Sequence, residues 1–279
     1  MQKLRCYRQY FGLSAVALSA AVLAAGTPPA TTAPTSDEAI AQYRAMFGDD
    51  NPAELWESRG KELWETARGP KHVALAAVCD LGLGAGVGAG AYARLPRYFQ
   101  DTKRVEDMES RLFDCMTDLQ GFERDALIAN RFGDGAHRSD LEALMAYLVA
   151  QSRGSKVTLP MRLAQEKEAY EIGRAIFYYR AGTHDFACST CHSESGKRIR
   201  LQNLPNLIDR HDAQYAYTTW PSYRVSQGEL RTMEWRVADC FRQQRLPELQ
   251  YGSPAAIALT MFLAKNAEGG VMNAPAIKR

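Results

Sequence analysis

The sequence lacks a strong excess of charge of either sign. Its 279 residues carry 34 Lys and Arg against 32 Asp and Glu, which gives a formal net charge of +2 at pH 7. Proteins that bind nucleic acid or an anionic lipid surface through charge carry a clear basic excess. The composition therefore argues against nucleic acid and lipid surfaces as partners.

The sequence also lacks a hydrophobic run that would comfortably span a bilayer, which takes about 20 apolar residues. The apolar stretch over residues 11–25 is shorter, and it follows a basic segment over residues 1–9 that contains no acid. This order is typical of a secretory signal peptide. We predict a cleaved signal over residues 1–25, with an uncleaved anchor as the alternative, and a disordered linker over residues 26–40. The mature protein is expected in the periplasm, without stable membrane insertion.

Cysteine is scarce, with six residues in the chain. Cleavage of the signal removes Cys6 and leaves an odd number in an exported protein. Because disulfides use cysteines in pairs, at least one remaining thiol has another role. The remaining cysteines are Cys79, Cys115, Cys188, Cys191 and Cys240.

Strand-type alternation is weak, whereas helical spacing of apolar residues recurs, which predicts an all-α fold. The chain also repeats itself, because residues 96–115 match residues 221–240 without a gap. Both segments read P-x-Y, then nine residues, then M-E-x-R-φ-x-D-C, where φ is apolar. The matching positions are Pro96/Pro221, Tyr98/Tyr223, Met108/Met233, Glu109/Glu234, Arg111/Arg236, Asp114/Asp239 and Cys115/Cys240.

Predicted helices flank the repeat on both sides. The similar pairs are "RGKELWE" (59–65) with "IGRAIFY" (172–178), and "LEALMAYLVA" (141–150) with "AIALTMFLA" (256–264). Ser139 and Ser253 stand at the N-cap positions of the two closing helices, and Pro254 suits the first helical position. We therefore predict two tandem helical domains, over residues 41–155 and 156–279.

The stretch "DFACSTCHSES" contains Cys188, Cys191 and His192 in the spacing C-x-x-C-H. In this motif the two thiols bond to the vinyl groups of a haem, and the histidine ligates its iron. A zinc site would need a second ligand pair nearby, and a thioredoxin-like motif would need a βαβ context. The sequence shows neither, so we predict one covalently bound haem c in a cytochrome c domain over residues 156–279.

The first repeat has no such motif. Aligned on its first thiol it reads Cys79-Asp80-Leu81-Gly82-Leu83, so Gly82 and Leu83 occupy the positions of the second cysteine and the histidine. This predicts a cytochrome-c-like domain over residues 41–155 that lacks haem. Cys79 and Cys115 are then expected to form a disulfide, which would replace some of the stabilisation that a haem gives.

Cys240 occupies the position in the second repeat that Cys115 occupies in the first. Its natural partners, Cys188 and Cys191, are used by the haem, so Cys240 is expected to face the haem as a free sulfur and a candidate axial ligand of the iron. Met233 and Met261 are alternative axial ligands, and a buried inert thiol is the alternative role for Cys240.

At these residues the chain resembles SoxA, the larger subunit of the SoxAX cytochromes of bacterial sulfur oxidation. The resemblance covers the chain from about Tyr43 onward and is carried by "GAYARLPRYF", "CSTCH" and "WRVADCFRQQR". It implies that His192 and Cys240 ligate the haem iron, and that Cys240 is modified to a persulfide. The departure from the haem motif at Gly82 and Leu83 implies the branch of the family with one haem.

The resemblance also implies an activity, L-cysteine S-thiosulfotransferase. Thiosulfate is joined to a cysteine of a carrier complex of the SoxYZ type, and two electrons pass to a small cytochrome subunit of the SoxX type. Cys240 is the implied site of a transient adduct, and Arg236, four residues before it, is the implied anion-binding residue. Because Arg111 is the counterpart of Arg236 in the haemless domain, an architectural role for Arg236 stays open.

Two other functions fit the residues. In the first, the protein is a periplasmic electron-transfer cytochrome in which Cys240 only ligates the iron. In the second, it is a redox or ligand sensor, although the chain contains no output domain. Labile sulfur on Cys240 would distinguish the transferase from the electron carrier.

Overall fold

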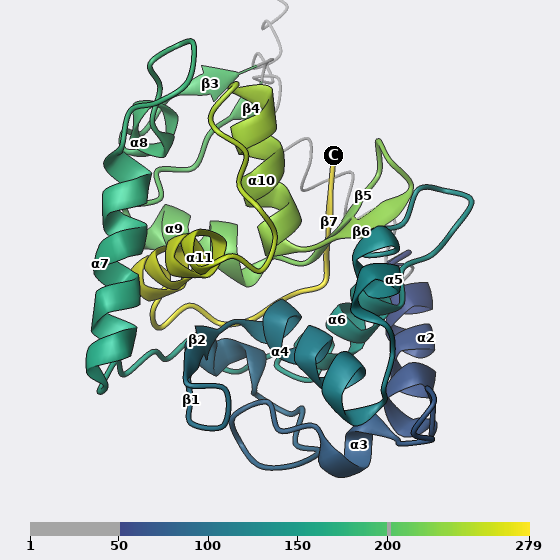
Figure 1. Ribbon diagram of the computed structural model, residues 1–279. Coiled ribbons are helices and arrows are strands. Elements are labelled where there is room, and N and C mark those ends of the chain that lie inside the picture. Colours follow the sequence, from purple (N-terminus) through teal and green to yellow (C-terminus); the bar gives the residue numbers. More distant parts are fainter. Residues whose placement is uncertain (1–50, 200–201) are drawn as a thin grey trace, which may run out of the picture. The chain divides into compact units, whose positions relative to one another are not determined.

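Helices account for most of the ordered elements (Figure 1). The computed structural model describes residues 51–199 and 202–279, so the predicted signal peptide and linker lie outside the described residues. None of the helices in these two ranges is long and apolar enough to cross a membrane.

The first half of the chain contains five α-helices, a 3₁₀ turn, a π-helical segment and a hairpin among its described residues. They are α2 (Glu54–Glu65), α3 (Leu75–Val78), the 3₁₀ turn η1 (Tyr92–Arg94), β1 (Arg97–Phe99), β2 (Arg104–Glu106), α4 (Met108–Asp114), the π-helical η2 (Cys115–Leu119), α5 (Arg124–Ala129) and α6 (Asp140–Ala150).

The second half contains a similar series of helices and a similar hairpin, with longer helices and the additional strands β3, β4 and β7. Its elements are α7 (Ala164–Tyr178), α8 (Cys188–His192), β3 (Arg198–Ile199), β4 (Gln202–Asn203), α9 (Arg210–Thr218), β5 (Ser222–Arg224), β6 (Glu229–Arg231), α10 (Met233–Gln243), α11 (Pro254–Asn266) and β7 (Ala276–Lys278).

The strands correct the prediction of an all-α fold. Antiparallel pairs form between β1 and β2, β3 and β4, and β5 and β6, while β7 adds to β5 in parallel. Each strand has only two or three residues, which is too short for the alternation that reveals a strand in a sequence. The fold is mainly helical with small sheets.

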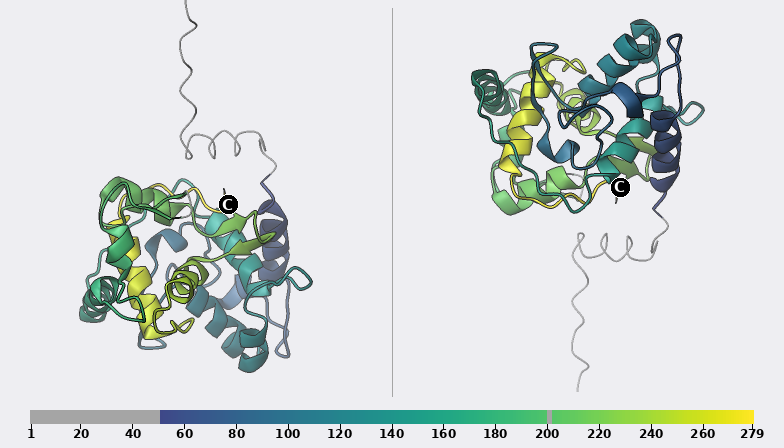
Figure 2. Two further views of the ribbon diagram at one scale, coloured as in Figure 1. Left: turned by 90° about the horizontal axis from the view of Figure 1, so that it is seen from above. Right: turned by 90° about the horizontal axis from the view of Figure 1, so that it is seen from below.

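Two close helix pairs frame the two halves, α2 with α6 and α7 with α11 (Figure 1 and Figure 2). A glycine allows each close approach. A Cβ on Gly60 would lie 1.9 Å from the carbonyl oxygen of Ala143, and a Cβ on Gly173 would lie 1.9 Å from that of Ala258. No side chain fits at such a distance. The two glycines stand at matching positions of the predicted repeat, so the same crossing occurs in both halves.

The closing helices start where the sequence predicts. The Ser139 hydroxyl accepts a hydrogen bond from the N–H of Glu142 at the start of α6, and the Ser253 hydroxyl accepts one from the N–H of Ala256 at the start of α11. Pro254 occupies the first turn of α11, where a missing N–H costs nothing.

The structure corrects the alignment of the two cysteine segments. A β-bridge between Arg68 and Val73 encloses a turn before α3, and a bridge between Ala181 and Phe186 encloses a turn of the same length before α8. Both turns carry a glycine at positive φ, Gly69 at 71° and Gly182 at 74°. This register aligns Leu75 with Cys188, Val78 with Cys191 and Cys79 with His192. The thiol of Cys79 therefore stands at the position of the histidine, and not at that of the first cysteine.

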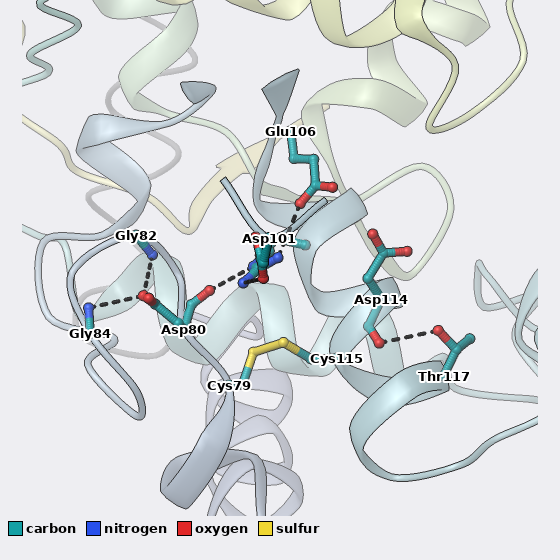
Figure 3. Close-up of a disulfide and its surroundings, with 10 residues drawn as sticks. Cys79, Asp80, Gly82, Gly84, Asp101, Glu106, Asp114, Cys115 and Thr117 are labelled. Atoms are coloured by element: carbon teal, nitrogen blue, oxygen red, sulfur yellow. Dashed lines mark hydrogen bonds and ion pairs between the residues drawn. A yellow bond between two sulfur atoms is a disulfide. The ribbon is translucent and has the colours of Figure 1, made fainter. Parts of the chain in front are cut away.

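Cys79 and Cys115 are joined by a disulfide that closes a loop with a sequence separation of 36 (Figure 3). Both cysteines are buried. Because Cys115 is the counterpart of Cys240, the disulfide joins the two positions that His192 and Cys240 occupy in the second half.

Arg111, on α4 one helical turn before Cys115, is fully engaged by its surroundings. Its Nε donates a hydrogen bond to the carbonyl oxygen of Asp80 at 2.7 Å, and its guanidinium forms ion pairs with Asp101 at 2.6 Å and Glu106 at 3.5 Å. The guanidinium also lies over the ring of Phe99, 4.3 Å from the ring centroid. Arg111 is therefore a structural cation with its charge compensated.

The first turns of α4 and α10 meet in a buried ionic group, the junction cluster, made of Asp107, Glu109, Arg131 and Glu234. Arg131 contacts Glu109 at 3.3 Å and Glu234 at 2.8 Å. Burial raises the pKa of Glu109 to about 7, and burial together with the charges of Asp107 and Glu109 raises the pKa of Glu234 well above its usual value. One guanidinium cannot neutralise three buried carboxylates, so the cluster retains a proton near neutral pH.

This proton makes stability depend on pH. The unfolded chain releases it above pH 4.5, whereas folded Glu109 holds it up to about pH 7, so the free energy of unfolding falls as the pH rises through that window. A fall of about 3 kcal/mol corresponds to this difference in pKa. A Glu234→Gln variant lacks a carboxyl group whose pKa is raised by folding, so unfolding releases fewer protons and the fall of the free energy of unfolding between pH 5 and 7, measured by urea unfolding, should be flatter.

Glu171→Gln is the matched control, because Glu171 is exposed on α7 and pairs only with Arg174 among the described residues. Its pH dependence should match that of the wild type. A Glu234→Gln curve parallel to the wild-type curve would show that the junction cluster is fully ionised in the folded protein.

Candidate functional site

A cavity of about 460 Å³ lies in the second half, with its walls formed by α7, α8, α9, α10, α11 and the segment after β4. Its walls are largely apolar. The apolar and aromatic lining residues are Phe177, Leu204, Pro205, Leu207, Ala213, Tyr215, Ala216, Tyr217, Trp220, Met233, Val237, Phe241, Leu259 and Leu263. Cys188, His192, Arg236 and Cys240 line the same space. The cavity thus brings together reactive groups that come from separate parts of the chain.

The C-x-x-C-H segment forms the short helix α8. Its first backbone turn is fixed by Thr190, whose hydroxyl accepts a hydrogen bond from the N–H of Ala187 at 2.9 Å. The helical turn places Cys188 and Cys191 on neighbouring positions of one face. Burial, followed by the charge of Cys240, raises the pKa of the Cys188 thiol to about 12. Both Cys188 and Cys240 therefore remain protonated when no electrophile or metal binds them.

His192 is held in a definite tautomer. Its Nδ1 lies 2.9 Å from the carbonyl oxygen of Pro205, and a carbonyl can only accept, so Nδ1 carries the hydrogen. The lone pair of Nε2 is left free, which is the arrangement that a metal-ligating imidazole needs. Burial and the nearby charge of Arg236 lower the pKa of His192, while the Pro205 carbonyl opposes them. The neutral, ligating form is favoured.

Cys240 projects from α10. Thr232 is the N-cap of this helix, and its hydroxyl accepts a hydrogen bond from the N–H of Trp235 at 3.2 Å. Burial raises the pKa of Cys240, and the charge of Arg236 opposes this shift. A thiolate at this position therefore needs further stabilisation by a metal ion.

Arg236 is one helical turn before Cys240 and lines the cavity. It contacts Asp239 at 3.4 Å, which is a long ion pair. Asp239 makes shorter contacts with Arg242 and Gln243, both at 2.6 Å. The carboxylate is thus mainly engaged elsewhere, and Arg236 keeps capacity to bind an anion.

Most residues predicted from the sequence lie at this cavity. Cys188, His192, Arg236 and Cys240 line it, and Cys191 is close enough to Cys188 for their charges to interact. Met233 also lines the cavity, whereas Met261 is buried and is not among the lining residues.

His211 and Trp220 also border the cavity. The side chain of His211 is 93% exposed, whereas Trp220 is buried and forms part of the cavity wall.

Four residues of the site are missing from the sequence prediction: Pro205, Arg224, Lys278 and Arg279. Pro205 acts through its backbone oxygen, which leaves no signal in residue type. Lys278 and Arg279 come from the segment of β7, which the sequence did not reveal as a strand. Arg224 could have been identified from the sequence, because it follows the P-x-Y segment of the second repeat at the position where the first repeat has Phe99.

The residues fit a covalently attached haem. Two thiols on one helical turn could bond to its vinyl groups, and the free Nε2 of His192 and the soft sulfur of Cys240 could ligate the iron. The apolar walls suit the porphyrin, and the cations at the cavity suit its propionates.

Comparisons with known proteins agree with this chemistry. A family model described as "SoxA/TsdA, cytochrome c domain" matches residues 59–157. The chain is 47% identical to the L-cysteine S-thiosulfotransferase subunit SoxA of Hydrogenophilus thermoluteolus over 96% of this chain and 98% of that protein. It is 35% identical to a SoxA subunit of Hydrogenobacter thermophilus over 67% of this chain and 68% of that protein.

A solved structure shares the fold. The crystal structure of SoxXA from P. pantotrophus superposes with a TM-score of 0.69 at 22% sequence identity. The superposition covers 85% of this chain and 84% of that one.

Proposed function

Because the chain belongs to the SoxA family, we propose that it is the haem-containing subunit of an L-cysteine S-thiosulfotransferase that acts in thiosulfate oxidation. The observation that carries the proposal is the cavity in which Cys240 and Arg236 lie together with Cys188 and His192. A redox centre, a nucleophilic sulfur and an anion-binding cation are the three parts that oxidative conjugation of thiosulfate requires.

We infer one haem c, bonded to Cys188 and Cys191 and ligated by His192 and Cys240. In the register of the structure, Leu75 and Val78 occupy the positions of these two cysteines, so the first half has no thiol to attach a second haem. The match of the cytochrome c family model to residues 59–157 supports a cytochrome-c-like origin for that half. We therefore assign residues 41–155 to a haemless domain and residues 156–279 to the haem domain.

The proposed reaction balances as an oxidation. The thiolate of Cys240 and the sulfane sulfur of thiosulfate form an S–S bond, and two electrons leave. The thiolate of a carrier cysteine then attacks the sulfane sulfur, the bond to Cys240 breaks, and the carrier retains an S–S–SO₃⁻ group while Cys240 is regenerated as a thiolate. When bound, the haem supplies an electron acceptor next to the reacting sulfur.

Arg236 and the cavity walls contribute binding and orientation. A planar guanidinium donates paired hydrogen bonds to oxyanions, so Arg236 suits the sulfonate oxygens of thiosulfate. The apolar walls exclude water and strengthen this interaction. The hydrogen bond from the Nδ1–H of His192 to the carbonyl oxygen of Pro205 fixes the orientation of the imidazole ring.

The proposed partners follow from the family. A SoxX-type cytochrome would take the second electron, and the solved relative is a SoxXA complex. The carrier would be a SoxYZ-type protein, and the substrate thiosulfate. The predicted signal peptide over residues 1–25 would place the reaction in the periplasm.

The test is an intact mass of the natively purified protein with a peptide map around Cys240. We expect one haem, and, after incubation with thiosulfate and the oxidised partner cytochrome but no carrier, extra sulfur on Cys240 that cyanide or a reductant removes. One haem and a Cys240 that stays unmodified under these conditions would favour the electron-transfer cytochrome. A second haem would contradict the assignment of the first half.

A further inference from the structure

The β5–β6 hairpin, which precedes Arg236, differs in its charged residues from the β1–β2 hairpin, which precedes Arg111. The two hairpins have the same register, with Arg97 opposite Glu106 in one and Ser222 opposite Arg231 in the other. The counterparts of Phe99, Asp101 and Glu106, which surround Arg111, are therefore Arg224, Ser226 and Arg231. A ring and two carboxylates have been replaced by two cations and a hydroxyl.

Arg231 is compensated within the protein. It pairs with the buried Glu142 at 2.8 Å and donates to the carbonyl oxygen of Gly133. The added positive charge near Arg236 therefore comes from Arg224.

Arg224 ends β5 and lines the cavity with Arg236 and Cys240. It is half-buried, and no carboxylate in the described ranges lies within ion-pair distance of it. Its Nε is buried and has no hydrogen-bond partner in this part of the chain. Burial and the charge of Arg236 lower the pKa of Arg224, while the charges of Asp239, which lies beyond ion-pair distance, and Cys240 oppose them. A desolvated donor next to a like charge is unfavourable unless an anion occupies the space between them.

The lining of the cavity supports an anion at this place. Arg224 and Arg236 both line it, and Asp212 is the one side-chain carboxylate among the lining residues that the structure describes. Two guanidinium groups suit a doubly charged anion such as thiosulfate. The propionates of a bound haem are the competing anions at this place.

We propose that Arg224 is a second anion-binding residue of the site, which together with Arg236 holds the sulfonate group of thiosulfate beside Cys240. This inference rests on the proposed function. With its sulfonate oxygens on the two guanidinium groups, thiosulfate keeps its sulfane sulfur free to react with Cys240. Arg224 thus binds and orients the substrate, whereas Arg111 and Phe99 only pack in the first half.

The test uses the haem-loaded protein in complex with its small cytochrome partner, with thiosulfate titrated at saturating carrier. In Arg224→Gln we expect the KM for thiosulfate to rise about 10- to 100-fold, as for loss of a buried hydrogen bond to a charged group, with kcat changed much less. The rise of KM with added salt should be weaker than in the wild type. Arg224→Lys should restore part of the affinity, because it keeps the charge but not the paired donors.

Arg174→Gln is the matched control. It removes one guanidinium from the exposed face of α7, where Arg174 pairs with Glu171, and it does not line the cavity. Its KM should match that of the wild type.

Haem content and the visible spectrum show whether Arg224 binds thiosulfate or a haem propionate. If Arg224→Gln keeps the wild-type KM, the inference is wrong, and a loss of haem or a spectral shift in that variant would make Arg224 a propionate anchor instead. If the wild type shows no thiosulfate turnover, the proposed function fails, and equilibrium binding of thiosulfate then decides on Arg224 alone. Equal binding by the wild type and Arg224→Gln would overturn the role of Arg224, whereas weaker binding by the variant would retain it.

Discussion

Replacing Cys240 with Met is expected to abolish thiosulfate turnover while the haem stays attached. A thioether can ligate the iron, but it cannot form and release an S–S bond with thiosulfate. The loss in kcat/KM should reach about 10³-fold or more, as for removal of a nucleophile. Reduction of the partner cytochrome, followed at saturating thiosulfate and carrier, measures it.

The same variant should differ from the wild type in its haem. Exchange of a thiolate for a thioether removes negative charge from the iron, so the reduction potential should rise. Cys240→Ser serves as a second variant, because it keeps the size of the side chain and removes the sulfur. Full turnover in Cys240→Met would mean that Cys240 is only an axial ligand and that the protein acts as an electron carrier.

Removal of the disulfide is expected to have the second largest effect, on stability. In a Cys79→Ser, Cys115→Ser double variant, the unfolded chain regains the freedom of a loop with a sequence separation of 36. The chain-entropy relation gives a loss of about 4 kcal/mol in the free energy of unfolding. Urea unfolding of the haem-loaded protein at one pH and temperature measures the difference.

Reduction of the wild-type protein offers an independent comparison. Treatment with a thiol reductant under unfolding conditions should bring its midpoint close to that of the double variant. Because neither cysteine lines the cavity, the KM for thiosulfate should stay unchanged in the folded double variant. Equal unfolding curves for the double variant and the untreated wild type would mean that other contacts of the first half suffice without the crosslink.

Local chemical patterns were readable from the sequence. The C-x-x-C-H segment, the N-caps Ser139 and Ser253, and the repeat ending at Cys240 depend on residues that are close in the chain. The alignment of Cys79 with Cys188 failed because it matched thiol with thiol. The backbone turn that starts at Gly69 and Gly182 sets the register instead, and it places Cys79 opposite His192.

Features that depend on tertiary structure were not readable. The hairpins are too short to leave a pattern, and the carbonyl of Pro205 leaves no trace in residue type. The exchange of Phe99 for Arg224 was visible in the repeat. The sequence did not show that Arg224 lines a cavity, and an arginine in an exposed surface hairpin would indicate no binding site.

The disulfide between Cys79 and Cys115 has a consequence for biogenesis. On the proposed assignment, the chain must oxidise this one pair of thiols while it keeps Cys188, Cys191 and Cys240 reduced until haem arrives. If the predicted signal peptide directs export, all five would reach the same oxidising environment, where a wrong pairing such as Cys188 with Cys191 would block haem attachment. Burial of the disulfide protects it from the reductants that haem attachment requires. The first half can therefore complete its maturation before the second half receives its cofactor.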